Sequence, residues 1–365
     1  MPLFTNYGGI LQAIALMAFL KEQGYDPLLL DRRYPSPKWR RLIKTALGST
    51  GVVDYKNVGA RQKEARSIAR FIKEFIPQRT QPIYSDAQLR KTIAKIPLEA
   101  VITGSDQVWR MEYMRTIWRN AFLDFVEDPS VKKIAYAASF GTARWEHPQF
   151  SKEIKQLLSS FSAVSVREAS GVQLCTDNFA CTTAKHVLDP TLLMEETFYY
   201  QFFDRDTEET PKKGIFTYFL DEEHHWDALL KLAAKEYSDT VFSMTSDKDD
   251  RRKDEGMSKP TPGEWLSHIY NAGFVITDSY HGMLFSITFK KPFIAIANKK
   301  RGTERFTSLV KELGLEERLI TEPTAVVSGL CSKTIDYEAV YRKLERWREA
   351  SRTFLLHSLE HKSTR

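Results

Sequence analysis

The sequence predicts an α/β protein with two parallel-sheet domains, and three observations lead to this expectation. Apolar runs typical of strands alternate with helical patterns along both halves of the chain, an alternation that favours parallel pairing. The chain has 365 residues, more than one core usually holds. Its composition, 42% hydrophobic and 12% aromatic, excludes a disordered or fibrous protein.

The first domain is expected over residues 1–195 and starts with the glycine loop Asn6-Tyr7-Gly8-Gly9. Apolar residues recur at helical spacing after this loop, which predicts a helix that ends near Gly24, and a strand is expected over Leu28–Leu30. A strand should also precede the loop, where only residues 1–5 are available, so we expect that this strand is absent or that the natural product starts upstream. A basic, mostly helical insert covers 32–96. The later elements are expected as strands at 100–103, 134–140 and 163–166 and a helix at 152–161.

The second domain is expected over 214–335, after a charged linker at 196–213. The sequence Thr261-Pro262-Gly263-Glu264 combines an N-cap, a proline at the first helical position and a capping-box glutamate, and therefore predicts a helix start. An amphipathic helix closes the chain at 337–359, within a C-terminal segment 336–365. The other elements are expected as strands at 215–220, 241–244, 274–277 and 293–297 and helices at 226–237, 282–289 and 304–313.

Charge and cysteine content narrow the class of protein. The net charge is +6, yet 13 basic and three acidic residues lie between Arg32 and Arg79, so the rest of the chain is slightly acidic. Such a basic segment favours an anionic membrane surface, an anionic substrate or nucleic acid, and a solvated helical face explains it equally well. Three cysteines without paired spacing favour neither a disulfide framework nor a zinc site, so no metal is expected. Without a signal or spanning segment, the expected location is the cytoplasm.

Two candidate ligand loops lie in the first domain, each where a helix is expected to begin. In Asn6-Tyr7-Gly8-Gly9 the glycines let backbone amides approach a phosphate or carboxylate, although a tight loop is an equal explanation. Ser105, Asp106 and Gln107 follow the strand at 100–103 directly. Asp106 could hold or deprotonate a hydroxyl group, and an N-cap is its simpler role.

The third candidate loop, Asp278-Ser279-Tyr280-His281-Gly282, is the sharpest. A histidine at a helix N-terminus feels a positive dipole that disfavours the imidazolium, so His281 is expected to be neutral near pH 7 and able to act as an acid/base group. Arg301 and Arg305 follow the next strand and could clamp a small anion, and Arg167 ends a strand of the first domain. Unliganded surface arginines are the common alternative.

Six motifs, in order over roughly residues 3–320, resemble the polysaccharide pyruvyl transferase family. They are Asn6-Tyr7-Gly8-Gly9-Ile10-Leu11-Gln12, Gly104-Ser105-Asp106-Gln107-Val108-Trp109, Ala135-Tyr136-Ala137-Ala138-Ser139-Phe140-Gly141, Val166-Arg167-Glu168, Leu188-Asp189-Pro190-Thr191-Leu192 and Thr277-Asp278-Ser279-Tyr280-His281-Gly282. The resemblance implies a GT-B-like fold, with two Rossmann-like domains facing a cleft, the first on the acceptor side and the second on the donor side. It also implies a C-terminal helix that crosses back to the first domain.

The resemblance further implies an enzyme that moves the enolpyruvyl group of phosphoenolpyruvate onto two hydroxyls of one sugar, forming a pyruvate ketal and releasing phosphate, with no cofactor. His281 and Asp106 would be catalytic. The substrate-binding residues would be Asn6, Tyr7, Gly8, Gly9, Ser105, Gln107, Arg167, Ser279, Tyr280, Gly282, Arg301 and Arg305. Some family members carry an arginine immediately before the motif histidine, where this chain has Tyr280, so Arg301 or Arg305 would have to bind the donor.

The acceptor implied by the family is a sugar of a lipid-linked repeat unit for capsule or exopolysaccharide, built at the inner face of the cell membrane. The basic segment would then contact anionic lipid. Two other functions fit the same architecture, a glycosyltransferase that uses a nucleotide sugar and a non-catalytic scaffold of polysaccharide assembly. Nucleic-acid binding is not expected, because the basic segment comes without an aromatic or recognition-helix motif.

Overall fold

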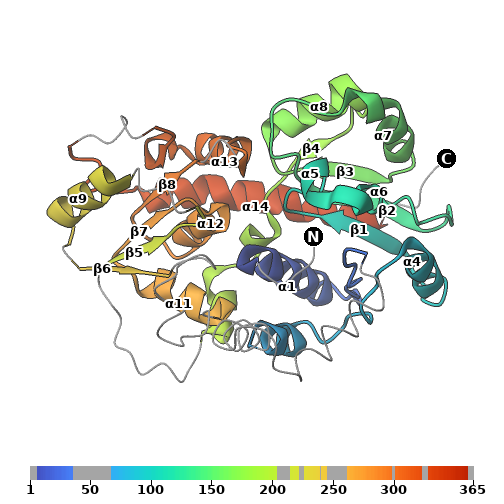
Figure 1. The fold of residues 1–365 in the computed structure, drawn as a ribbon, viewed down its shortest axis with the longest axis horizontal. Helices are drawn as coiled ribbons and strands as arrows, with labels where there is room; N and C mark the ends of the chain where they lie inside the picture. Colours follow the sequence, from blue (N-terminus) through green and yellow to red (C-terminus); the bar gives the residue numbers. More distant parts are fainter. Residues whose placement is uncertain are drawn as a thin grey trace, which may run out of the picture.

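The structure is a computed structural model that describes residues 6–35, 67–203, 214–221, 226–238, 240–244, 261–297, 301–322 and 328–360. The expected strand before the glycine loop, residues 36–66 of the basic insert and residues 204–213 of the linker lie outside the described residues. The two halves of the chain each build one parallel sheet (Figure 1).

The first sheet has four parallel strands in the order β1-β2-β3-β4. The strands expected at 100–103, 134–140 and 163–166 are present, because most of their apolar residues are buried, as is usual in a fully parallel sheet. The strands are β1 (Ala100–Gly104), β2 (Lys132–Ala138), β3 (Ala163–Val166) and β4 (Lys185–His186). The helices of this half are α1 (Tyr7–Glu22), α4 (Asp86–Ile93), α5 (Met111–Met114), α6 (Trp118–Ala121), α7 (Ser151–Leu158) and α8 (Ala169–Phe179), with 3-10 turns at η1 (Arg115–Ile117) and η2 (Pro148–Phe150).

The strand expected over Leu28–Leu30 was a wrong prediction. Leu29 and Arg32 make only isolated bridges, to Arg79 and Ile83 respectively, outside both sheets. Prolines at positions 77 and 82 of the opposing segment have no amide hydrogen to donate, so a continuous ladder cannot form there.

The second sheet has five parallel strands in the order β6-β5-β7-β8-β9. The predicted capping box is confirmed at the start of α11, where Thr261 and Glu264 each accept a hydrogen bond from the other's backbone amide. The strands are β5 (Ile215–Tyr218), β6 (Val241–Ser243), β7 (Phe274–Thr277), β8 (Phe293–Ile296) and β9 (Leu319–Ile320). The helices are α9 (Asp227–Glu236), α11 (Pro262–Asn271), α12 (Tyr280–Thr288) and α13 (Glu304–Leu313), with a 3-10 turn at η7 (Glu316–Arg318).

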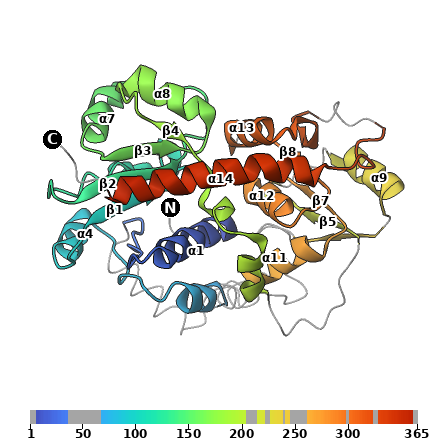
Figure 2. The ribbon, with the colours of Figure 1, turned by 180° about the vertical axis from the view of Figure 1, so that it is seen from behind.

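The halves are joined by two segments that cross between them. Residues 190–202 form the 3-10 segments η3 (Pro190–Leu192) and η4 (Glu196–Phe202). The helix α14 (Tyr337–Glu360) then runs back across both sheets, as Figure 2 shows. Its Tyr341 hydroxyl donates to the carbonyl of Thr288 at 2.7 Å, and its Ser351 hydroxyl accepts from the amide of Leu188 at 3.0 Å. The expected crossing of the C-terminal helix is therefore confirmed.

The helix α1 lies between the two halves rather than on an outer face (Figure 1). Ile10, Leu11 and Ala15 are buried, and Tyr7 packs against Trp265 of α11 with ring centroids 5.8 Å apart. Its position brings the glycine loop to the second half of the chain. Within the described parts of the chain, no helix has the length and apolar character needed to span a membrane.

Candidate functional site

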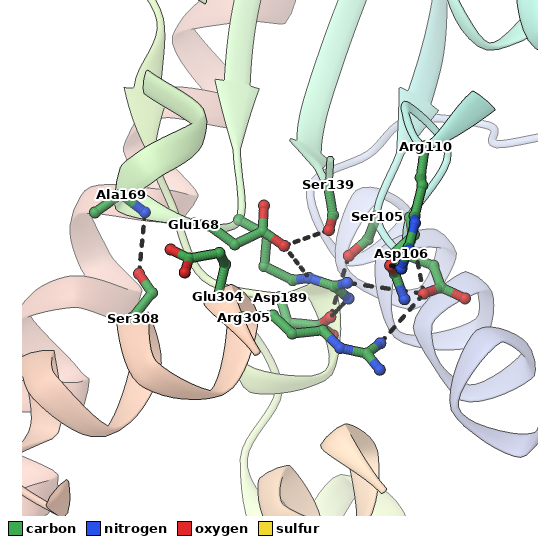
Figure 3. Close-up of polar contacts among 12 residues, drawn as sticks. Ser105, Asp106, Arg110, Ser139, Glu168, Ala169, Asp189, Glu304, Arg305 and Ser308 are labelled. Carbon is green, nitrogen blue, oxygen red and sulfur yellow. Dashed lines mark hydrogen bonds and ion pairs between the residues drawn. The ribbon is translucent and has the colours of Figure 1, made fainter. Parts of the chain in front are cut away.

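Four charged or titratable side chains that follow strands of both sheets meet between the halves, and Figure 3 shows two of them, Asp106 and Arg305. Asp106 follows β1 and Arg167 follows β3, whereas His281 lies in the first turn of α12 and Arg305 in the first turn of α13. Each is at most 6% exposed. Parallel strands direct their carboxyl ends to the same edge of a sheet, so the loops of the two sheets meet there.

Asp106 is held in a strained and ionised state. Its backbone has φ 61°, a left-handed conformation that costs free energy in a residue other than glycine. The carboxylate accepts hydrogen bonds from Asn6 Nδ2 and from the backbone amide of Gln107, both at 2.9 Å. Burial alone would raise the pKa of Asp106, but the nearby charges of Arg167 and Arg305, 3.7 and 3.9 Å away, lower it below the ordinary value.

Asp189, directly after the first sheet, is the most extensively bonded carboxylate of the site. Its Oδ2 accepts from Ser105 Oγ at 3.1 Å, from an Arg167 terminal nitrogen at 2.9 Å, and from Gln12 Nε2. Its Oδ1 accepts from the amide and the hydroxyl of Thr191. Burial opposes ionisation, yet the interactions with His281 and then with the positive charge of Arg167 lower the pKa of Asp189, so the carboxylate is charged.

Arg167 and Arg305 come from opposite halves and flank one aromatic ring. Their guanidinium carbons lie 4.6 and 5.3 Å from the centroid of the Tyr280 ring. Burial, followed by the charge of Arg167, lowers the pKa of Arg305, although an arginine stays protonated. Among the described residues, Arg167 Nε and Nη2 and Arg305 Nε have no hydrogen-bond partner. Such unpaired donors beside two like charges are suited to an anionic ligand.

His281 faces the same cluster from the start of α12. Ser279 caps this helix by accepting from the amide of Gly282 at 3.2 Å. His281 Nε2 lies 3.7 Å from Asp189 Oδ2 and has no hydrogen-bond partner in the described part of the chain. Burial lowers the pKa of His281 to about 4, so the imidazole is neutral near pH 7, with burial rather than the helix dipole as the main cause.

Gly8 of the glycine loop lies directly against the His281 imidazole. A Cβ at Gly8 would lie 2.0 Å from His281 Nδ1, closer than any side chain can approach. By contrast, a Cβ at Gly9 would lie 3.3 Å from its nearest neighbour, the Asn6 amide nitrogen. The loop therefore uses Gly8 for close packing against the imidazole.

Two further glycines let the halves approach each other beside the site. Gly141 has φ 72° and Gly302 has φ 88°, and a Cβ at Gly302 would lie 2.1 Å from the carbonyl oxygen of Gly141. A Cβ at Gly141 would lie 2.0 Å from Gln107 Oε1. Nearby, the amide of Ala169 donates to Ser308 Oγ of α13 at 3.0 Å (Figure 3).

Unlike Arg305, which faces Asp106, Arg301 is paired within its own half of the chain. Its guanidinium donates to both carboxylate oxygens of Asp221, at 2.8 and 2.6 Å. Asp278 supports this arrangement because it accepts from the amides of Leu220 and Asp221 at 2.6 and 3.1 Å. Burial raises the pKa of Asp278 to about 6. Asp221 is 80 positions away in sequence, so the pairing could not be read from spacing.

Most other sequence candidates have packing or capping contacts at or near this cluster. A Cβ at Gly282 would lie 2.6 Å from Thr277 Oγ1, which ties the start of α12 to β7. Candidates of this kind are Asn6, Tyr7, Gly9, Ser105, Gln107, Ser279 and Gly282.

The sequence candidates did not include Asp189, Gln12 and Glu168. All three are part of motifs that carried the family resemblance, and this was the only signal for them. Glu168 accepts a hydrogen bond from Ser139 Oγ beside Arg167 (Figure 3), and burial raises its pKa.

One group of side chains apart from this cluster has metal-ligand chemistry. Ligand atoms of Glu112, Glu146 and His147 lie within 4.8 Å of one another. Glu112 is already paired, with His147 Nε2 at 2.9 Å and Arg110 Nε at 3.7 Å. A divalent cation would have to displace both contacts. Glu112, Glu146 and His147 are not part of the cluster between the halves.

Comparison with known proteins identifies the fold and a family. The model of the polysaccharide pyruvyl transferase family matches residues 6–300. No curated protein sequence matches the chain. A UDP-N-acetylglucosamine 2-epimerase from Rickettsia bellii is 11% identical, with a TM-score of 0.52 and coverage of 96% of this chain and 94% of that chain. A Listeria monocytogenes protein described as a UDP-N-acetylglucosamine 2-epimerase is 8% identical, with a TM-score of 0.51 and coverage of 94% and 88%. These structures show the fold alone, which is the expected GT-B type.

Proposed function

The chain belongs to the polysaccharide pyruvyl transferase family, and we propose that it transfers the enolpyruvyl group of phosphoenolpyruvate onto two hydroxyls of a sugar in a polysaccharide or its lipid-linked precursor. The observation that carries this proposal is the set of buried nitrogen atoms on Arg167, Arg305 and His281 that have no hydrogen-bond partner among the described residues. These side chains come from both halves, so a ligand bound by them would lie between acceptor and donor sides.

The two arginines supply the donor subsite in this proposal. Phosphoenolpyruvate carries a carboxylate and a phosphate, and guanidinium groups match both by planar, paired hydrogen bonds. Arg167 and Arg305 retain unpaired donors, whereas Arg301 is bonded to Asp221. We therefore assign donor binding to Arg167 and Arg305, with Tyr280 as the ring that orients both guanidinium groups.

His281 serves as the acid/base group of the reaction. A proton is added to the methylene carbon of phosphoenolpyruvate while one sugar hydroxyl adds to the neighbouring carbon and loses its proton. Phosphate then leaves as the second hydroxyl adds, and the second hydroxyl proton leaves with phosphate, which balances the ketal and phosphate products. The imidazole moves these protons, and the arginines stabilise the charge on the departing phosphate.

Asp106 contributes as a hydrogen-bond acceptor that orients a sugar hydroxyl. Its lowered pKa makes it a weak base, so holding a hydroxyl suits it better than deprotonating one. The strained backbone at φ 61° fits a residue whose position matters for function. The residue predicted as catalytic from sequence thus receives a binding role.

The acceptor is proposed to be a sugar of a lipid-linked repeat unit at the inner face of the cell membrane, with the basic residues between 32 and 79 in contact with anionic lipid. Flotation with vesicles of phosphatidylglycerol and phosphatidylcholine tests this contact. Binding that rises with the anionic fraction and falls with salt is expected. Binding that is insensitive to both contradicts it.

Phosphate release from phosphoenolpyruvate, with and without galactose, glucose and mannose acceptors in lipid-linked or synthetic form, tests the reaction. We expect release that depends on an acceptor, and a product mass increased by one pyruvate less one water. A folded protein that releases no phosphate with any acceptor, and instead binds a nucleotide sugar saturably, would show a glycosyltransferase. Binding of neither donor would favour a scaffold.

A further inference from the structure

Asp189 has the most hydrogen bonds of any carboxylate at the site, yet donor binding and proton transfer as described above do not use it. Its side chain is fully enclosed, with 1% of the residue exposed. The two hydrogen bonds from Thr191 to Oδ1, at 3.0 and 2.8 Å, fix the plane of the carboxylate. Oδ2 is thereby directed at the cluster.

The bonds to Oδ2 join three separate segments of the first half. Ser105 donates at 3.1 Å and Arg167 at 2.9 Å, and Gln12 donates from α1. The arginine that we assign to the donor is therefore oriented by Asp189. Because the same oxygen lies 3.7 Å from His281 Nε2, it is also the charge nearest to the imidazole across the boundary between the halves.

The charged and titratable groups around His281 are Asp189 and Asp106, which favour the imidazolium, and Arg167 and Arg305, which disfavour it. The ring of Tyr280 lies 5.5 Å away, and Gly8 of α1 closes the remaining side. At 3.7 Å the contact with Asp189 is too long for a hydrogen bond, so the carboxylate acts on His281 through its charge. An anion bound to the two arginines would offset their repulsion of the imidazolium.

We propose that Asp189 is a positioning residue that enables His281 to take up a proton when an anion binds to Arg167 and Arg305. The inference rests on the proposed function for its role in turnover, since the imidazolium would supply the proton for the enol carbon. Proton uptake itself requires only anion binding. It can therefore be measured with inorganic phosphate, the reaction product, without any turnover.

Calorimetric titration of the full chain with phosphate, in buffers of different ionisation enthalpy, measures the protons taken up per ligand. The uptake by His281 is the number of protons taken up per phosphate in wild type minus the number in His281→Gln. Protons that phosphate itself gains or loses occur in both proteins and cancel in this difference. A neighbouring opposite charge shifts a pKa by about one to three units, which would raise the pKa of His281 from about 4 to between about 5 and 7. The difference should therefore reach about half a proton or more near pH 5, and it should fall several-fold in Asp189→Asn. Asp189→Glu, which restores the charge, should recover part of it.

Gln12→Met is the matched control because it removes a hydrogen bond from the same Oδ2 and leaves the charge of Asp189 in place. We expect it to keep the uptake of the wild type even if its melting temperature falls as far as that of Asp189→Asn. Equal uptake in Asp189→Asn and wild type would overturn the inference. Phosphate binding with the same proton uptake in wild type and His281→Gln would also overturn it, and this comparison does not require any Asp189 variant to fold. A failure of the protein to bind phosphate would overturn it as well.

The two proposals fail in different ways. If phosphate binds with Asp189-dependent uptake but phosphoenolpyruvate is not turned over with any acceptor, the proposed reaction fails and the inference holds. If turnover is found and uptake does not depend on Asp189, the reaction holds and the inference fails. In the second case a positioning role in turnover is excluded too when the pH profile of kcat is the same in Asp189→Asn and wild type.

Discussion

The two halves of the molecule contribute to the site in different ways. On the first half, Asp106 and Asp189 are tied by hydrogen bonds to several segments of the chain. On the second half, His281 Nε2 and Arg305 Nε are buried without a hydrogen-bond partner among the described residues. A buried polar group without a partner is costly, and a bound ligand that accepts its hydrogen bond would remove that cost. The first half thus supplies two carboxylates fixed by hydrogen bonds, together with Arg167, whose Nε and Nη2 also have no hydrogen-bond partner in the described part of the chain, and the second half supplies His281 and a second arginine.

The strongest test of this comparison is His281→Gln. The substitution removes the acid/base group and breaks no hydrogen bond at Nε2, so we expect turnover to fall about 100- to 10,000-fold while the protein stays folded. Phosphate release measures the loss, and circular dichroism with thermal melting verifies the fold. Full activity in a folded variant would contradict the acid/base role of His281.

The contact between the halves is tested by Gly8→Ala. The new methyl group would lie 2.0 Å from His281 Nδ1, so the imidazole has to move, and a displacement near 1 Å costs roughly 100-fold in rate. Gly9→Ala is the matched control, because its methyl group meets only Asn6 Nδ2, at 3.3 Å. Equal turnover in the two variants would show that the packing of Gly8 on His281 does not matter for the reaction.

Two arginines of the second half can be compared by the substitutions Arg305→Met and Arg301→Met. Arg305 Nε has no hydrogen-bond partner among the described residues, whereas Arg301 is paired with Asp221. Loss of a charged hydrogen bond to the donor should raise the KM for phosphoenolpyruvate about 10-fold or more in Arg305→Met. Arg301→Met should leave this KM close to that of wild type, because Arg301 is bonded to Asp221. The reverse order of effects would place the donor at Arg301.

The prediction for Asp278, which supports the loop that holds Arg301, concerns stability and leaves the reaction aside. Its pKa of about 6 in the folded protein lies above the ordinary value of 3.8, so the folded state binds more protons between these values. Stability from this group is present below about pH 4 and is lost as pH rises to about 6, by roughly 3 kcal/mol. In urea titrations, the unfolding free energy of wild type minus that of Asp278→Asn should decrease as the pH rises from about 4 to about 6. A flat difference would contradict it.

Much of the fold could be predicted from the sequence, because the apolar runs of a buried parallel sheet are self-evident in strands such as β3 and β7. The prediction failed at Leu28–Leu30, where an apolar run faces a segment interrupted by prolines. It also did not include β9, whose two residues are too short for a pattern. Local sequence therefore predicts a strand only where its partner can complete the ladder.

The site was predictable in part. Asp106, Arg167, His281 and Arg305 were found because each follows a strand, and strand ends converge in this fold. The contacts of Asp189 were not predictable, because they join it to residues 177 and 84 positions away. Such long-range pairing leaves no periodic signal in a single sequence.

A crystal structure of the protein with phosphoenolpyruvate, in the absence of an acceptor, tests the central claim most directly. We predict that carboxylate or phosphate oxygens lie within hydrogen-bond distance of Arg305 Nε and Arg167 Nη2, with the enol carbons next to His281 and the bonds between Asp189 and Arg167 unchanged. A structure with phosphoenolpyruvate bound elsewhere, and with these nitrogen atoms still unpaired, would contradict the account.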